Sequence, residues 1–202
     1  MKMICESEQL EHYLTECDNV NYNHSKIVET TNALFNMSQT ETDKVRIAFE
    51  FVRDDIFHSW DIQRKKVTCR ASDALLYKVG ICYAKSHLLA ALLRSQGIPT
   101  GFCYQRLILF DTPEKGYCIH ALNAVYLSTH NKWIRLDARG NKEGIDAQFS
   151  TKEEKLAFPI QKTLNEIDYP LIYVKPHPKV VSALKSSVNA LEMYKYYLPS
   201  CL

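Results

Sequence analysis

Residues 80–99 read GICYAKSHLLAALLRSQGIP and predict a strongly helical segment with a cysteine at its start. The helical run extends from Tyr83 to Ser95, and Gly97 followed by Pro99 is typical of a helix end. Cys82 therefore lies near unpaired backbone N–H groups and the positive end of the helix dipole. That environment stabilises a thiolate and can make a cysteine nucleophilic, with Gly80 expected to allow a sharp turn before it. By position alone, a small residue at a crowded helix start is an equally good interpretation.

Beyond this helix the hydrophobic period changes from 3.6 to 2. Three runs rich in β-branched and aromatic residues, 102–110, 117–127 and 132–136, predict strands. Residues 111–116 and 128–131 between them have turn compositions. The sequence thus predicts a three-stranded antiparallel meander directly after the cysteine helix.

The meander supplies two partners for the cysteine. If the turn pairs Tyr126 with Asn131, His120 stands opposite Asp137, and a two-residue slip leaves both side chains on one face. A carboxylate beside an imidazole orients the ring through its second nitrogen. Taken alone, His120 and Asp137 are each better interpreted as structural residues. Their combination with Cys82 is what predicts a catalytic site. His87 lies about 140° around the helix from Cys82 and is a poor base for its thiol.

The flanking chain reads mainly as packing elements. Upstream, helical patterns follow Ser7, include Ile27, and follow a capping box at Thr40. Downstream, residues 171–174 predict a strand, and a helix begins at Pro178. Its expected apolar stripe consists of Val181, Leu184, Val188 and Leu191.

Composition excludes several classes of protein. The 202 residues hold 25 basic and 23 acidic side chains, and a net charge of +2 gives no electrostatic case for nucleic acid. The start of the chain lacks a signal-peptide pattern, and no run is apolar enough for a membrane span. Seven cysteines without a CxxC spacing indicate neither a zinc ribbon nor thioredoxin-type chemistry. We therefore expect one domain, residues 1–202, in a reducing cytoplasmic setting, folded without disulfides.

Three separated motifs resemble those of the transglutaminase-like superfamily in order and spacing. They are the cysteine helix at 80–99, HALNAVY at 120–126 and WIRLD at 133–137, and FVRDDI at 51–56 resembles the helix that precedes them. The chain departs from the family pattern after His120, where ALN replaces the usual Trp and acidic residue, so no substrate preference is carried over.

The resemblance implies an α+β, papain-like fold with the nucleophile helix packed on an antiparallel sheet. It covers a catalytic core of about residues 45–140, between a helical part (1–44) and a C-terminal extension (141–202). It further implies Cys82 as nucleophile, His120 as general base and acid, and Asp137 as the residue that orients His120, with no cofactor or metal.

The implied activity is that of a cysteine-dependent amide hydrolase or acyltransferase acting on a protein or peptide through a thioester. The Cys82 N–H is a natural oxyanion donor, and candidates for a second donor are Trp60, Gln63 and Tyr77.

Three alternatives stay open. One is a catalytically silent binding or scaffold module of the same fold, and another is small-molecule acyl transfer of the arylamine acetyltransferase type. The third is a metal site formed by Cys103, Cys118 and His120 across the first hairpin. His58, His130 and His177 are interpreted as surface or loop residues.

Overall fold

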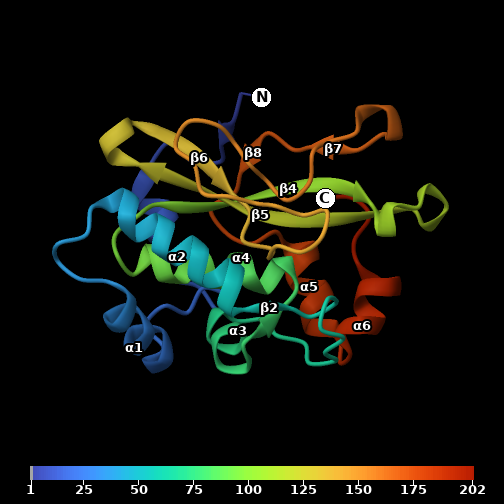
Figure 1. Ribbon diagram of the computed structural model, residues 1–202, viewed down its shortest axis with the longest axis horizontal. Coiled ribbons are helices and arrows are strands. Elements are labelled where there is room, and N and C mark those ends of the chain that lie inside the picture. Colours follow the sequence, from blue (N-terminus) through green and yellow to red (C-terminus); the bar gives the residue numbers. More distant parts are fainter. Residues whose placement is uncertain (1) are drawn as a thin grey trace.

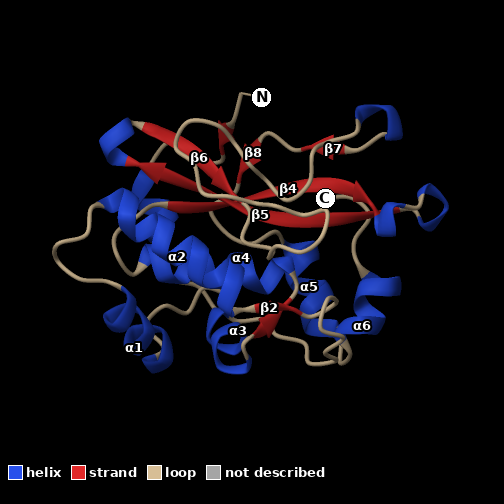
Figure 2. Cartoon of the chain, viewed as in Figure 1, coloured by secondary structure: helices blue, strands red, loops and turns tan. Residues whose placement is uncertain are grey.

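The computed structural model describes residues 2–202, apart from the side chain of Asp111. A four-stranded antiparallel sheet forms one layer, in the order β6-β5-β4-β7, and Figure 1 and Figure 2 show the helices gathered along one side of it. Its strands are β4 (Thr100–Ile108), β5 (Tyr117–Leu127), β6 (Lys132–Leu136) and β7 (Ile167–Asp168). Two short parallel pairs complete the strands: β1 (Ile4–Cys5) with β8 (Leu171–Ile172), and β2 (Phe57–His58) with β3 (Val79–Gly80).

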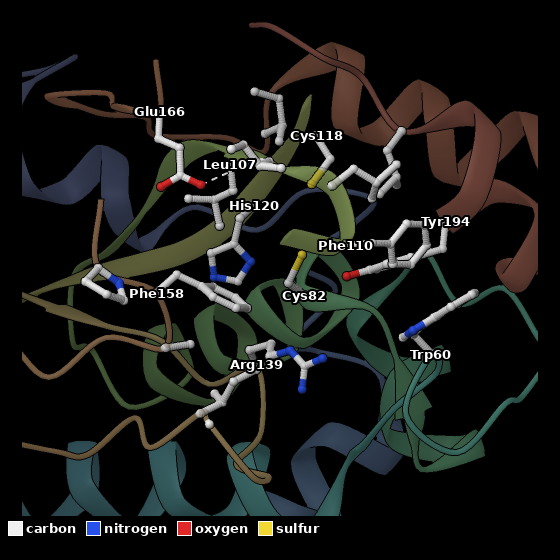
Figure 3. A pocket seen from close by; sticks show the side chains of 18 of the residues that line it. Trp60, Cys82, Leu107, Phe110, Cys118, His120, Arg139, Phe158, Glu166 and Tyr194 are labelled. Carbon is white, nitrogen blue, oxygen red and sulfur yellow. Dashed lines mark hydrogen bonds between the residues drawn. The ribbon is translucent and has the colours of Figure 1, made fainter. Parts of the chain in front are cut away.

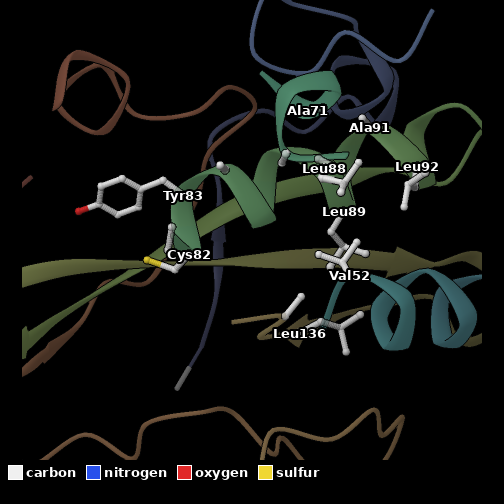
Figure 4. Close-up of a cluster of buried hydrophobic side chains, with 14 of the residues drawn as sticks. Val52, Ala71, Cys82, Tyr83, Leu88, Leu89, Ala91, Leu92 and Leu136 are labelled. Atoms are coloured by element: carbon white, nitrogen blue, oxygen red, sulfur yellow. The ribbon is translucent and has the colours of Figure 1, made fainter. Parts of the chain in front are cut away.

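The helices surround one central member, α4 (Cys82–Arg94). The others are α1 (Ser25–Leu34), α2 (Glu41–Asp55), α3 (Ala71–Tyr77), α5 (Pro178–Ser186) and the single turn α6 (Ala190–Glu192). Every residue of α4 is buried, and Figure 4 shows its leucines packed with Val52 of α2 and Leu136 of β6. A helix that is buried all round is the core of the molecule rather than a cover for it. The helix predicted at 83–95 is confirmed, and Gly97 has the positive φ of 71° expected after its end.

Polar side chains of α4 hold the surrounding segments in place. Lys85 donates to the carbonyls of Arg53 and Ile56 at the end of α2. Among the described side chains the Arg94 guanidinium has no acidic partner, and it donates instead to three carbonyl oxygens in distant parts of the chain. These belong to Thr15, Thr100 and Val174, at 2.6 Å to the nearest nitrogen in each case. Arg94 thus joins the N-terminal segment, β4 and the segment after β8 to one helix.

The register of the meander differs from the predicted one by two residues. Tyr126 pairs with Trp133 rather than with Asn131, because residues 128–130 form a 3-10 turn and Asn131 takes a left-handed conformation with φ 49°. The ladder ends with Leu136 opposite Asn123, so Asp137 comes one residue later. An even shift preserves the side of the sheet, and Asp137 therefore remains on the face of His120.

Other expectations for the meander and the N-terminal part need correction. β4 runs from Thr100 to Ile108, not from 102 to 110, because Phe110 has a left-handed φ of 58° that ends the strand. The first helical pattern is only a 3-10 segment at Leu10–Leu14. Helix α3 was not predicted, since its seven residues are too few to show a clear period.

The C-terminal helix begins at Pro178 as predicted and buries Leu184, but the rest of the expected apolar stripe needs correction. Helix α5 ends at Ser186, and Asn189 starts a new turn by accepting hydrogen bonds from the N–H groups of Leu191 and Glu192. Val188 lies between the two helices and is 95% exposed. The buried side of α5 consists of Val180, Ala183 and Leu184.

Two further properties concern the cysteines and the membrane. None of the seven cysteines forms a disulfide in the described part of the chain. Within residues 2–202, none of the helices has both the length and the apolar character that crossing a bilayer requires.

The buried guanidinium gives a stability prediction. Arg94→Met should lower the free energy of unfolding by about 3 kcal/mol or more, because charge-assisted hydrogen bonds contribute about 1.5–3 kcal/mol each and three carbonyls lose their donor. Urea unfolding measures the difference. The control is Arg46→Met, which removes a side chain that is 43% exposed, in surface ion pairs, and should cost less than about 1 kcal/mol. Equal losses in the two variants would contradict the anchoring role of Arg94.

Candidate active site

Cys82 is the first residue of α4, and the short parallel pair β2–β3 leads into it. Its side chain is buried, and no side chain caps the helix at Ile81. The N–H of Cys82 is thus among the groups that a helix start leaves without an intrahelical partner. A Cβ on Gly80 would lie 3.0 Å from the Ala84 Cβ and 3.1 Å from the Thr68 hydroxyl. Glycine is therefore required here by close packing, and not by the sharp turn that the sequence suggested.

His120 and Asp137 form the hydrogen bond that the strand register allows. The Nε2 of His120 lies 2.8 Å from Oδ2 of Asp137. With Nε2–H donating to this carboxylate, Nδ1 is the nitrogen available to Cys82, and Figure 3 shows the sulfur beside the imidazole. The structure thus brings together all three residues that the sequence singled out.

The carboxylate of Asp137 is completely buried and fixed from two further directions. Its Oδ2 also accepts from the N–H of Ala157 at 3.1 Å, and its Oδ1 accepts from the N–H of Arg139 at 3.2 Å. Burial alone would raise its pKa, but His120 and these two N–H groups outweigh burial and hold the pKa below the usual value. Asp137 is therefore an anion with a fixed orientation.

The imidazole is strongly biased toward its charged form. Burial lowers the pKa of His120, but the charges of Asp137 and Cys82, and its hydrogen bonds to both, raise it to about 10. An imidazolium at neutral pH can pair with a thiolate and later give a proton to a leaving group.

Two hydrogen bonds fix the helix against the histidine strand. The Tyr83 hydroxyl donates to the carbonyl of Ile119 at 2.7 Å. Asn123, within the segment that departs from the family pattern, donates through Nδ2 to Ser86 of α4 at 3.1 Å and to Gly101 of β4 at 3.2 Å. Residues next to Cys82 and next to His120 are thus held at a set separation.

These groups open into a cavity of about 440 Å³, within the range of volumes typical of ligand sites. Trp60, Phe110 and Tyr194 form an aromatic wall, and Phe158 lies edge-on to His120 with ring centroids 5.0 Å apart (Figure 3). The buried Glu166 also lines the cavity, and its carboxylate accepts from the N–H groups of Ile108 and Gln161. One border of the cavity is thus aromatic, and another carries a carboxylate.

A cluster of charge lies near the sulfur. Arg139 and Lys142 both donate to the carboxylate of Asp61. Burial lowers the pKa of Arg139, but Asp61 and more distant negative groups raise it overall. Glu143 lines the cavity next to Lys142, so charges of both signs lie on this side.

Sequence reasoning missed the contribution of residues 141–202. Ala157, Phe158, Glu166 and Tyr194 all come from this region, which had been interpreted only as an extension. The run of tyrosines at 194, 196 and 197 was a signal in the sequence, but nothing in its spacing indicated which tyrosine would face the site.

The histidines outside the site need one correction. His58 is not on the surface: it is buried, its ring lies 5.7 Å from that of Tyr194, and burial holds its pKa well below the usual value. His130 is exposed, and His177 caps α5. His87 is buried against the Cys69 carbonyl, away from the cavity lining.

Only one of the three predicted oxyanion donors lies at the cavity. Trp60 lines the cavity. Gln63 is exposed and donates to the carbonyl of Trp60, while Tyr77 is 49% exposed beneath the ammonium of Lys66. Neither Gln63 nor Tyr77 borders the cavity, so both expectations are wrong.

The metal alternative finds no support. Cys103 packs in a separate apolar cluster with Tyr13 and Leu122, whereas Cys118 and His120 line the cavity. Among the residues that the structure describes, no three His, Cys, Asp or Glu side chains gather to hold a metal ion.

Comparison with known proteins gives a family and a fold. Residues 28–138 match the model of the transglutaminase-like superfamily, and none of the curated proteins matches the sequence. A candidate cysteine protease from Cytophaga hutchinsonii is similar in structure, with a TM-score of 0.52, 16% identity, and coverage of 66% of this chain and 43% of that one. A TGase structure gives a TM-score of 0.44 at 18% identity, over 91% of this chain and 52% of that one. The chain spans about half of these proteins or less. The similarity to the first of them confirms the predicted α+β, papain-like fold.

The His120–Asp137 pair gives a titration prediction. In NMR titrations the His120 imidazole should stay protonated through neutral pH, with a pKa near 10, and Asp137→Asn should lower that pKa by at least about one unit, or about 1.4 kcal/mol. Since the folded-state pKa lies above the unfolded value of about 6.5, this pair stabilises the fold below pH ~6.5 and the contribution is lost as pH rises toward 10. A His120 signal that titrates near pH 6.5 in both proteins would contradict this account.

Proposed function

Because the chain belongs to the transglutaminase-like superfamily, as its motifs indicated, we propose that it is a thiol enzyme that forms a thioester with an amide substrate at Cys82. The observation that carries the proposal is the arrangement at one cavity. The sulfur of Cys82 lies at the start of α4, beside an imidazole whose far nitrogen is 2.8 Å from a buried carboxylate. A structural cysteine requires none of these features.

The proposed reaction has two halves. The Cys82 thiolate attacks the amide carbonyl, and the His120 imidazolium gives its proton to the departing amine. Water or a second amine then attacks the thioester, with His120 taking the proton from this nucleophile. The first outcome is hydrolysis and the second is transamidation. Asp137 fixes the tautomer and stabilises the charged ring throughout.

We propose a protein or peptide as the substrate. In support, the cavity combines an aromatic wall with the charged groups of Arg139, Lys142 and Glu166, a mixture suited to an amide within a chain of varied side chains. The small-molecule alternative predicts acyl transfer from simple esters to arylamines without any peptide. The scaffold alternative predicts no covalent adduct at all.

Mass spectrometry with an electrophilic amide probe tests the thioester proposal directly. Cys82 should be modified at neutral pH, and Cys201, which is exposed and lies outside the cavity, is the internal reference. A modification rate at Cys82 no faster than at Cys201 would favour the scaffold alternative.

Substitutions give the matching activity prediction. Cys82→Ala should abolish turnover of any amide or ester substrate found by screening. Cys82 is the thiol at the helix start beside the His120 imidazole, whereas the other thiol of the cavity, Cys118, lies in strand β5. Asp137→Asn should leave a residual rate, lower by about 10⁴, as expected when the ring loses its orienting carboxylate. Melting curves for both variants provide the control for folding. Full activity in Cys82→Ala would rule out a thiol enzyme.

A further inference from the structure

Tyr194 has no role in the steps above, although it borders the same cavity. It comes from a π-helical turn, Met193–Tyr197, near the end of the chain. Figure 3 shows its phenol oxygen directed toward the sulfur of Cys82. Turns of this kind are rare and frequently occur at functional sites.

The ring of Tyr194 is held in place from several sides. It stacks on Trp60 with centroids 5.0 Å apart and planes 15° from parallel. Phe110 packs against it at 5.7 Å, and His58 meets it edge-on, also at 5.7 Å. These three partners come from two separate parts of the chain, so the direction of the hydroxyl is fixed by the tertiary structure and not by the turn alone.

The hydroxyl faces the cavity rather than the protein interior. Among the described residues no hydrogen bond engages it, so it is available to a group bound in the cavity. Burial, together with the nearby Cys118 and Cys82, raises its pKa well above the usual value. Tyr194 therefore presents a protonated donor to the cavity at any physiological pH.

Within the proposed function, the first half-reaction needs such a donor. As the Cys82 sulfur bonds to the carbonyl carbon, one electron pair of the C=O bond moves onto oxygen and creates an oxyanion. The backbone N–H of Cys82 can donate one hydrogen bond to this oxygen, and an effective oxyanion hole usually has a second donor. When the oxyanion collapses, the C=O bond re-forms, the C–N bond breaks, and the amine takes the proton of His120.

We propose that the hydroxyl of Tyr194 is this second donor, with Trp60 as the residue that positions it. Trp60 was the remaining sequence-based candidate and also lines the cavity, but it is the phenol oxygen of Tyr194 that Figure 3 shows directed toward the sulfur of Cys82. The proposal rests on the thioester mechanism and adds to it a catalytic residue from the C-terminal part of the chain. It also explains why the aromatic wall stands beside the nucleophile.

The experiment compares two reactions of Cys82 that differ in whether an oxyanion forms. p-Nitrophenyl acetate acylates the thiol through a tetrahedral oxyanion, whereas iodoacetamide alkylates it by direct displacement without one. Tyr194→Phe should lower the Cys82 acylation rate by about 10²–10³, the usual effect of losing one oxyanion donor. Its alkylation rate should stay within about twofold, since the proposal leaves the thiolate itself unchanged.

The matched control is Tyr196→Phe, which removes a hydroxyl from the same turn at a residue that is 72% exposed and should change neither rate. Trp60→Phe should keep a stacking surface and reduce acylation far less than Tyr194→Phe does. Trp60→Phe also serves if Tyr194→Phe does not fold, because a full 10²-fold loss there would assign the donor role to the indole and overturn the proposal.

Three further outcomes have distinct meanings. Equal acylation in wild type and Tyr194→Phe would overturn the role of Tyr194 while leaving the thioester mechanism intact. Equal losses of acylation and alkylation would also overturn it, because Tyr194 would then act on the sulfur. A wild-type protein that is not acylated at Cys82 would instead contradict the proposed function.

Discussion

The hydrogen bond from the Tyr83 hydroxyl to the Ile119 carbonyl is the contact on which the site most depends. Tyr83 follows the nucleophile and Ile119 precedes the histidine, so this single 2.7 Å contact joins the two chain positions whose separation decides whether sulfur and imidazole can meet. Asn123 adds a second attachment one turn further along the helix. Since the whole of α4 is buried, neither contact competes with water, and a small displacement of the helix would leave polar groups unpaired in the core.

The rest of the molecule maintains that docking. Lys85 binds the end of α2. Gly140 beside it has a positive φ of 111°, which other residues rarely adopt, and a Cβ there would also crowd the Lys85 ammonium and the Arg53 carbonyl oxygen, at 3.2 and 3.3 Å. The pKa of Lys85 is lowered to about 7, mainly by burial and also by the charge of Arg139, although nearby carboxylates raise it. The backbone N–H of Ala157, in the C-terminal part of the chain, donates to the carboxylate of Asp137. The C-terminal part is thus a component of the site, and its backbone supplies a hydrogen bond that no side-chain pattern encodes.

Features that depend on interactions between residues close in the sequence could be predicted, and features that depend on packing between distant segments could not. The cysteine helix, its glycine stop and the parity of His120 with Asp137 depend on local periodicity, and each was correct despite a two-residue error in register. Val188 was misplaced because one capping residue, Asn189, ended a pattern that otherwise continued. The positions of His58 and Tyr194 depend on packing between segments more than one hundred residues apart, for which periodicity carries no information. The catalytic candidates were therefore accessible from the sequence, but the cavity around them was not.

Several buried polar atoms near the site have no hydrogen-bond partner among the described residues. They lower the stability of the fold. The Oδ1 of Asn123 and the Oε1 of Gln105 have no hydrogen-bond partner, and Gln105 lies directly opposite His120 in the β4–β5 ladder. Each such group costs about 1–3 kcal/mol, a penalty that a purely structural sheet would avoid with apolar side chains. The charge of His120 adds a further cost, which Asp137 and Cys82 offset only while all three remain together. An ion pair held in advance needs little reorganisation when charge develops on a substrate, and this is the physical advantage that a costly, rigid site can provide.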